Sequence, residues 1–352
     1  MVQSIGFDSF KYTRLQKDAI LKRMQGYKRF YLECGGKLCY DLHASRVLPG
    51  YKATAKVNLI RSLNKCDIIY CINARDLESK KLLPDFRLSY EQQILKDLAD
   101  IKSFGLKANK VVITRYSGEL HALHCKRILE KKGINVYIHK EMHGYPHNPI
   151  KSLQLLRSQP YIPVKARLIV MTGAAGGSGK MAVALSQLYH EYRKGLEAGF
   201  AKYETFPIWN LPIAHPINLA YEAATADLHD SLSIDKFHLR KYGIKSVNYN
   251  RDIQNFAVLK KLIELISGKI GYNSPTDMGI NMAKESIVDE AICISASREE
   301  VLRRYIRSIQ DYSNGRGSPS TIKRIEEIMH KANISPVLVK NLTRVHFPNV
   351  KN

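Results

Sequence analysis

A strand, a glycine-rich loop and a helix, in that order, constrain this chain more than any other feature of its sequence. Residues 167–172 (RLIVMT) form a short apolar run rich in branched side chains, which predicts a buried strand. Residues 173–180 (GAAGGSGK) follow as a loop, and residues 181–189 have apolar side chains at helical spacing. The backbone N–H groups of such a loop and of a helix N-terminus can surround a phosphate group. The expected phosphate ligands are Gly173, Gly176, Gly177, Ser178, Gly179 and Lys180.

The loop departs from the P-loop pattern G-x-x-x-x-G-K-[ST] at two positions. Ala174 stands where the first glycine is expected, and Met181 stands where serine or threonine is expected. Because methionine has no hydroxyl group, a bound Mg²⁺ would need other ligands. We expect ATP or another nucleotide as the cofactor, with Mg²⁺ as its companion ion. The alternative is an ordinary strand-to-helix turn that binds nothing.

Strands alternate with helices along the first part of the chain, which predicts an α/β fold with a doubly wound, mainly parallel sheet. The ligands of such sheets bind beyond the carboxyl ends of the strands. We therefore expect the loops at residues 35–37, 73–75, 115–118 and 173–180 to lie on one rim. Gly35, Gly36 and Lys37 follow a strand just as the glycine loop does, so we expect them to contact a substrate.

The character of the sequence changes after the helix that follows the glycine loop. Residues 204–230 contain three prolines and the single tryptophan, and residues 246–333 are mainly helical in pattern. The predicted organisation is an α/β domain over residues 1–245, a mainly helical second domain over residues 246–333, and a basic tail over residues 334–352.

Polar residues between positions 204 and 252 supply the candidates for catalysis and for binding a second substrate. Carboxylates near a phosphate site suit Mg²⁺ or proton transfer. The catalytic candidates are His215, Glu222 and Asp227, with His229 and Asp230 as further metal ligands. The substrate-binding candidates are Asn218, Asn248, Asn250, Arg251 and Asp252, among which Arg251 can clamp a phosphate or carboxylate. The alternative for both groups is structural: a polar helix face, and a capping turn with an Arg–Asp pair.

The composition argues against a membrane protein and is compatible with nonspecific attraction to nucleic acid. The 55 Lys and Arg exceed the 32 Asp and Glu, and the resulting net charge of +23 is spread along the chain rather than gathered in a stripe. A basic surface with nonspecific attraction to nucleic acid follows from this charge. No apolar run is long enough for a signal peptide or a membrane span, so we expect no membrane insertion. Six cysteines without a C-x-x-C pair favour a cytoplasmic protein.

Several long strings of residues resemble a bacterial family of unknown function, the uncharacterised protein family 0371. The strings are LECGGK, HASRVLPGY, GSGKMA, YETFPIWNLPIAHPINLAYEAATADL, VNYNRDI and SPTDMGINM. The resemblance implies an α/β N-terminal part, a helical middle and a further C-terminal α/β domain, and this sequence ends where that last domain would begin. Some members carry the label ATP-dependent peptidase. The zinc-peptidase pattern H-E-x-x-H is not matched, because Lys194 stands in the place of the second histidine of residues 190–194.

We therefore expect a phosphate-bearing small molecule, a nucleotide, to bind the glycine loop of a homo-oligomeric protein. Phosphoryl or nucleotidyl transfer, or ATP-driven ligation, is the expected chemistry if the protein is an enzyme. A non-catalytic binding protein for RNA or an acidic partner is the alternative, and an ATP-dependent peptidase is a third possibility.

Overall fold

A seven-stranded parallel sheet forms the centre of the protein. The computed structural model describes residues 5–79, 82–83, 86–228, 230–269 and 271–334. The sheet has the strand order β4-β3-β2-β5-β1-β6-β9, and every neighbouring pair is parallel. Its strands are β1 (Arg29–Cys34), β2 (Cys66–Asn73), β3 (Lys110–Tyr116), β4 (Asn135–Lys140), β5 (Leu168–Gly173), β6 (Ala198–Tyr203) and β9 (Gly279–Ile280). The predicted α/β fold with a mainly parallel, doubly wound sheet is confirmed.

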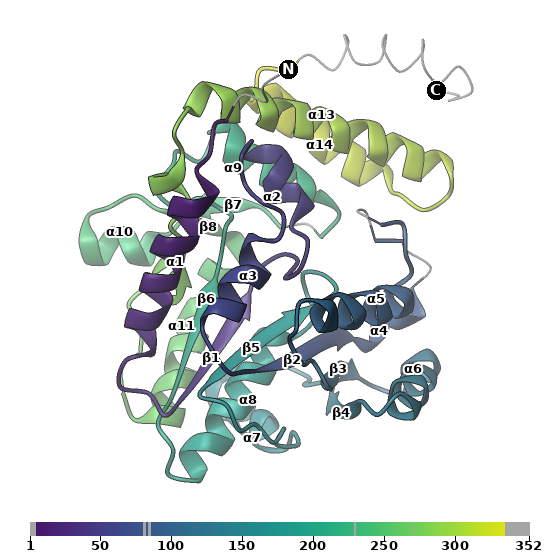
Figure 1. Cartoon of the computed structure of the whole chain (residues 1–352), viewed down its shortest axis with the longest axis vertical. Helices are drawn as coiled ribbons and strands as arrows, with labels where there is room; N and C mark the ends of the chain where they lie inside the picture. Colours follow the sequence, from purple (N-terminus) through teal and green to yellow (C-terminus); the bar gives the residue numbers. More distant parts are fainter. Residues whose placement is uncertain (1–4, 80–81, 84–85, 229, 270, 335–352) are drawn as a thin grey trace.

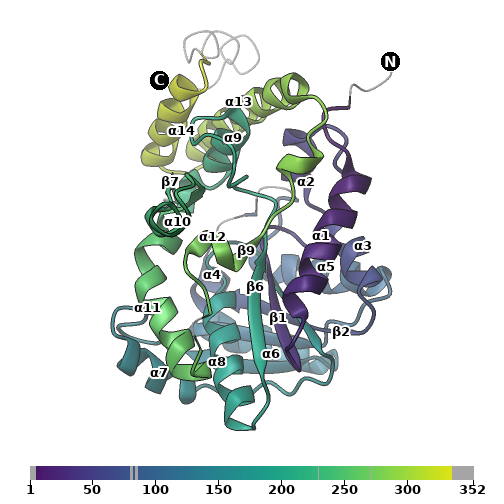
Figure 2. The same ribbon diagram turned by 90° about the vertical axis from the view of Figure 1, so that its left-hand side faces the viewer.

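Helices cover both faces of this sheet (Figures 1 and 2). One face packs on α1 (Ser9–Met24), α3 (Ala55–Ser62), α4 (Ala74–Glu78), α5 (Tyr90–Ser103) and α6 (Leu120–Lys131). The other face packs on α7 (Pro149–Arg157), α8 (Lys180–Arg193) and α11 (Asn250–Ser267). Because both faces are covered, the central strands are almost continuously apolar, and every residue of β5 is buried.

A group of helices lies beyond the carboxyl ends of β1 and β6 (Figure 1). It consists of α2 (Leu42–Val47), α9 (Pro216–Ala224), α13 (Glu290–Ser313) and α14 (Pro319–Lys331). Helix α13 packs on the other three, and Phe206, just after β6, stacks on Tyr221 of α9. This helical group therefore lies over the edge of the sheet at which β1 and β6 end.

A smaller unit stands beside the group. The strands β7 (Leu232–Ile234) and β8 (Val247–Tyr249) form an antiparallel pair around α10 (Lys236–Tyr242), and α12 (Pro275–Met278) packs next to them. Two short 3-10 turns, η1 (Ala226–Leu228) and η2 (Lys284–Ser286), complete the described elements.

The later part of the chain is built into the same core as the earlier part. Helix α11 packs on α7 and α8, β9 extends the sheet beside β6, and α13 packs on α9. The domain boundary expected at residue 245 stays a prediction. Of the expected basic tail, residues 335–352 lie outside the described part of the chain.

A buried ion pair ties α3 to the end of β1. The Lys56 ammonium lies 2.6 Å from Asp41 Oδ2 and donates a hydrogen bond of 2.5 Å to the carbonyl oxygen of Gly35. Both side chains are buried, and Asp41 also caps α2 by accepting from Ala44 N–H. Burial alone would raise the pKa of Asp41, but the charge of Lys56 holds that pKa below its usual value.

We predict that Lys56→Met destabilises the fold strongly, because it leaves a buried carboxylate without its counter-charge. The expected loss is about 3–5 kcal/mol in the free energy of unfolding, measured in urea at neutral pH. Adding Asp41→Asn removes that charge and keeps the cap on α2, so the double variant should recover much of the loss. A double variant less stable than Lys56→Met would contradict this account of the pair.

Candidate functional site

The glycine loop joins the central strand β5 to helix α8 and has the backbone geometry of an anion-binding turn. Gly177 and Gly179 have left-handed backbones, with φ of +76° and +83°, and Gly179 is followed directly by the right-handed residues of α8. A left-handed residue next to a right-handed one turns successive N–H groups toward a common point. Within the described residues, no side chain caps the N-terminus of α8. Its first N–H groups are therefore available to a ligand.

Tight packing fixes the position of this loop against β2 and β3. A Cβ atom on Gly179 would lie 2.6 Å from Oγ1 of Thr114, a residue of β3. The same hydroxyl donates a hydrogen bond of 2.9 Å to the Ser178 carbonyl oxygen. Ser178 is itself buried. A larger residue at position 179 would therefore push the loop away from the sheet.

The loop lies at the point where the winding of the sheet changes direction. The connection after β2 leads to β3, which lies on the side of β2 away from β5. The connection after β5 runs in the opposite direction, through α8 and past β1 to β6. Parallel sheets bind their ligands at such points. The second glycine loop arrives at the same rim, because Lys37 donates a hydrogen bond of 2.5 Å to the carbonyl oxygen of Ala174. The two glycine–lysine loops are therefore neighbours, as the sequence predicted.

Lys180 and Glu33 meet beneath the loop. The Lys180 side chain is buried, and its Nζ lies 3.9 Å from Glu33 Oε1 and 3.4 Å from Ser178 Oγ. Glu33 is the penultimate residue of β1, the strand next to β5. Its second oxygen, Oε2, is buried and has no hydrogen-bond partner among the described residues. A buried oxygen without a partner is costly unless a ligand or ion completes it.

The alternation of charge continues from Glu33 to α11. Glu33 stands opposite Lys202 of β6 in the sheet register, and Lys202 forms a close ion pair with Asp252 in the first turn of α11. Burial alone would lower the pKa of Lys202, but the carboxylates of Asp252 and Glu33 raise it above its ordinary value. We call Lys180, Glu33, Lys202 and Asp252 the charge chain.

Glu204 lies next to the charge chain, and its surroundings favour the protonated form of its carboxyl group. It comes two residues after Lys202 and is 9% exposed. Burial raises its pKa to about 8, and the charges of Asp252 and Glu33 add to the effect, which Lys202 opposes. No hydrogen bond or ion pair joins its carboxyl group to another described side chain. Such a group can give up or accept a proton near neutral pH.

Sequence reasoning missed Glu33, Lys202 and Glu204. A signal for the first two was present, since each is the single charged residue in the last four positions of an apolar strand, in RFYLEC and AGFAKY. A charge within a buried strand demands a partner or a function.

Helix α9 carries candidates that the structure places away from the loop. His215 caps α9 by accepting from Ile217 N–H and bonds to Glu290 at 2.9 Å. Glu222 forms an ion pair with Arg324 of α14, and burial raises its pKa despite that charge. Asn218 is fully buried and holds the backbone of Ile208. These residues connect α9 to its surroundings rather than forming one polar face.

Asp227 is the catalytic candidate that lies beside the glycine loop. It belongs to η1, whose Leu228 would be 3.0 Å from a Cβ atom on Gly176. His229 lies outside the described residues. The catalytic roles of His215, Glu222 and Asp227 stay predictions.

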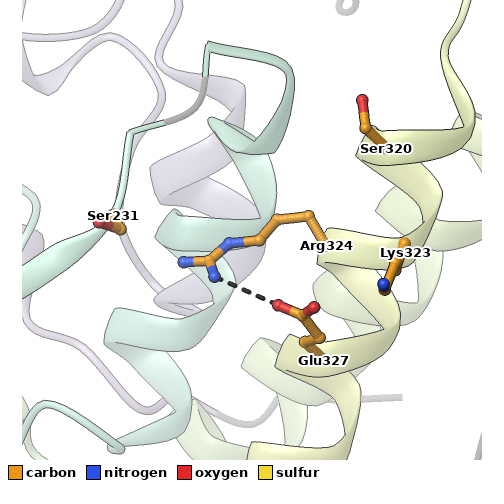
Figure 3. A pocket seen from close by; sticks show the side chains of 5 residues that line it. All are labelled: Ser231, Ser320, Lys323, Arg324 and Glu327. Carbon is orange, nitrogen blue, oxygen red and sulfur yellow. Dashed lines mark hydrogen bonds and ion pairs between the residues drawn. The ribbon is translucent and has the colours of Figure 1, made fainter.

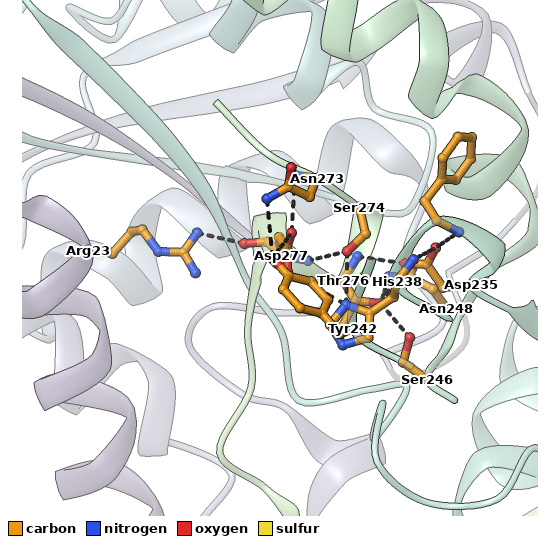
Figure 4. A network of polar contacts seen from close by, with 11 residues as sticks. Arg23, Asp235, His238, Tyr242, Ser246, Asn248, Asn273, Ser274, Thr276 and Asp277 are labelled. Atoms are coloured by element: carbon orange, nitrogen blue, oxygen red, sulfur yellow. Dashed lines mark hydrogen bonds and ion pairs between the residues drawn. The ribbon is translucent and has the colours of Figure 1, made fainter. Parts of the chain in front are cut away.

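Of the substrate-binding candidates at residues 248–252, one belongs to a structural polar network, one begins a helix and two form ion pairs. Asn248 is buried and bonds to Thr276 within a polar network around Asp235 that joins α10, α12 and β8 (Figure 4). Asn250 begins α11, and Arg251 forms an ion pair of 3.0 Å with Asp230. The Arg–Asp pair expected within residues 248–252 is therefore replaced by two others, since Arg251 pairs with Asp230 and Asp252 pairs with Lys202.

A cavity of about 350 Å³ opens between β7 and α14 (Figure 3). Its walls carry two cations and one carboxylate, and Arg324 points inward while paired with Glu327 at 3.3 Å. The lining residues are Ser231, Ser320, Lys323, Arg324 and Glu327. None of the predicted phosphate ligands lines it, so it is separate from the glycine loop.

The described side chains do not form a metal site by themselves. No group of three or more His, Cys, Asp and Glu among them is arranged to hold an ion. Any ion at the glycine loop would therefore share its coordination between the protein and the oxygens of a bound ligand.

Comparison with known proteins identifies the family. Residues 5–333 match the family model described as "Domain of unknown function DUF1846, N-terminal". This chain belongs to that family. It is similar to a UPF0371 protein of Clostridium tetani, with 46% identity over 334 residues, covering 94% of this chain and 66% of the relative. It is also similar to a UPF0371 protein of Streptococcus sanguinis, with 45% identity over 340 residues, covering 96% of this chain and 69% of the relative.

The resemblance to family 0371 is thereby confirmed over nearly the whole chain. The chain spans about two thirds of the length of the curated relatives it matches. In the part that the structure describes, no helix is both long and apolar enough to cross a membrane.

The buried carboxyl of Glu204 predicts a measurable pH dependence of stability. The unfolded chain ionises this group near pH 4.5, whereas the folded chain retains the proton up to about pH 8. Between these values, rising pH favours the unfolded state by roughly 1 kcal/mol per pH unit. Glu204→Gln abolishes this contribution, so its stability relative to the wild type should increase from pH 5 to pH 8 in urea titrations.

The matched control is Glu299→Gln, which neutralises an exposed carboxylate. The stability of Glu299→Gln should change with pH in the same way as that of the wild type. Parallel curves for Glu204→Gln as well would show that Glu204 is ionised in the folded protein and would refute its assignment as a proton carrier.

Proposed function

We propose that this protein binds the phosphate groups of a nucleotide at the glycine loop of residues 173–180. The observation that carries the proposal is the uncapped start of α8 behind two left-handed glycines, with the buried ammonium of Lys180 beneath it. Backbone N–H groups and the positive end of the helix dipole favour a phosphate there. Lys180 would supply the positive charge that the helix start alone lacks.

Glu33 is the best-placed residue for a metal ion that accompanies the phosphates. Mg²⁺ prefers oxygen ligands and completes its shell with phosphate oxygens and water. Glu33 ends the strand beside the loop, and its Oε2 lacks a partner among the described residues. In nucleotide-binding proteins with a P-loop, an acidic residue at the end of a strand holds the magnesium ion. The lack of a hydroxyl group at Met181 is therefore no obstacle.

The reaction that fits the site is transfer of a phosphoryl or nucleotidyl group, or a ligation driven by ATP. Each requires a group that takes a proton from the attacking atom. Glu204 becomes that base when it is ionised, and Lys202 lies close enough to stabilise the resulting negative charge. The second substrate would approach over the Gly35–Gly36–Lys37 loop and the start of α11, where Asn250 and Arg251 lie.

The main alternative is a non-catalytic protein that holds RNA or an acidic partner. The net charge of +23 favours this alternative. It predicts binding that weakens steeply with salt and does not respond to nucleotides.

Thermal unfolding in the presence of nucleotides tests the proposal. A ligand at a concentration of 100 times its Kd adds about 2.7 kcal/mol to the stability of the folded state. We predict that ATP or ADP with Mg²⁺ raises the Tm of the wild type by several degrees and that Lys180→Ala abolishes the increase. Lys245→Ala, which removes an exposed lysine outside the glycine loop, should respond like the wild type.

Two results would overturn the proposal. One is an equal increase in Tm for the wild type and Lys180→Ala, because the nucleotide would then bind elsewhere. The other is the absence of a shift with a full panel of nucleotides. Glu33→Gln separates the role of the metal, since it should remove only the part of the shift that depends on Mg²⁺.

A further inference from the structure

Helix α13 carries a row of charged residues that has no part in the glycine-loop site. The row consists of Glu300, Arg303, Arg304, Arg307 and Asp311, at spacings of three, four, seven and eleven residues. Residues at these spacings share one face of a helix. The face is directed toward α2 at its first end and toward the chain before α5 at its second end.

The two carboxylates of the row are already fully used. Glu300 is buried and accepts hydrogen bonds from Arg46 at 2.7 Å and from Arg304 at 2.8 Å, and Arg303 lies 3.4 Å away. At the other end, Asp311 forms an ion pair of 2.7 Å with Arg87. Arg46, Arg303 and Arg304 thus share Glu300, and Arg87 takes Asp311. Arg307, in the middle of the row, adds a fifth arginine to these two carboxylates.

Arg307 occupies that middle position, and no carboxylate of the described residues forms an ion pair with it. It is half-buried, and no hydrogen bond or ion pair joins its guanidinium to another described residue. Burial and the like charges of Arg304, Arg87 and Arg303 lower its pKa from the usual value, and Asp311 opposes them only in part. With Arg307 included, the cluster holds three more positive than negative charges.

We propose that Arg307, together with Arg303 and Arg87, binds the phosphate group of a small molecule. Guanidinium groups present pairs of N–H donors in a planar fork that matches phosphate oxygens. Arg303 and Arg307 approach from one helix, one turn apart, whereas Arg87 comes from the segment before α5 and reaches α13 through its ion pair with Asp311. Glu300 and Asp311 hold Arg304 and Arg87 in place and are positioning residues.

The charge and burial of the cluster favour a terminal phosphate or a diphosphate over a nucleic acid backbone. An excess of three positive charges matches a group that carries two or more negative charges, whereas each phosphodiester carries one. Because the guanidinium of Arg307 is half-buried, a terminal phosphate can reach it more easily than a phosphate within a nucleic acid backbone. This proposal does not depend on nucleotide binding at the glycine loop, which lies at the end of β5.

Titration calorimetry with pyrophosphate, followed by inorganic phosphate, tests the proposal on the whole chain. Lys180→Ala is the background variant, because it disables the glycine loop and leaves α13 unchanged. We predict that Arg307→Ala in this background weakens pyrophosphate binding by ~10-fold or more, as expected for the loss of a charge-assisted hydrogen-bond pair. Arg240→Ala, which removes an exposed arginine of α10, should leave the affinity unchanged.

Thermal unfolding in phosphate-free buffer separates binding from a structural role. Arg307→Ala should be as stable as the wild type or more stable, because it relieves repulsion among arginines, and phosphate should no longer stabilise it. Lower stability without phosphate would show a structural arginine and overturn the proposal. Equal pyrophosphate affinity in Arg307→Ala and Arg240→Ala would overturn it as well. Binding of a single-stranded RNA that depends on Arg307, without binding of pyrophosphate, would replace the small molecule with nucleic acid.

Discussion

The charge chain behind the glycine loop is the interaction on which the candidate site depends. Lys180, Glu33, Lys202 and Asp252 alternate in sign from the start of α8, across β1 and β6, to the start of α11. The two lysines are buried and the two carboxylates are partly buried, so each charge depends on its neighbours. The charge chain thereby fixes the N-termini of α8 and α11 against the sheet and places the ammonium group of Lys180 under the loop.

Buried charges of this kind do little for stability that apolar side chains could not do. Replacement of a buried ion pair by well-packed apolar residues is often neutral or stabilising. Perturbed ionisable groups concentrate at functional sites. Here the perturbed groups, the buried Glu33 oxygen that lacks a partner and the uncapped start of α8 meet at the carboxyl edge of the sheet. That coincidence is the reason for proposing a ligand site here in place of an ordinary strand-to-helix turn.

Local sequence patterns predicted the elements better than the contacts between them. The apolar run of β5, the glycines and the helix after Lys180 were readable, because a continuous apolar strand and a glycine turn each follow from short-range rules. The placement of the loops at residues 35–37 and 173–180 on one rim followed from the parallel topology, and the bond from Lys37 to Ala174 agrees with it.

Such short-range rules could not predict contacts between segments that are far apart in the sequence. Glu222 meets Arg324 across 102 residues, and Lys202 meets Asp252 across 50. Nothing within either sequence window indicates which partner neutralises a charge. The candidates on α9 likewise have separate partners: His215 bonds to Glu290 of α13, Glu222 pairs with Arg324 of α14, and Asn218 holds the backbone of Ile208. A rule that flags single charges in apolar strands would have found Glu33 and Lys202.

The most direct test of the account is a titration of the ¹⁵N-labelled protein with ATP and Mg²⁺, followed by amide NMR. The account predicts that the amide resonances of Gly176, Gly177, Gly179 and Lys180 shift more than those of any other loop, with saturation that matches a single site. Saturable shifts confined to another part of the molecule, with these four amides unchanged, would contradict a phosphate site at the start of α8.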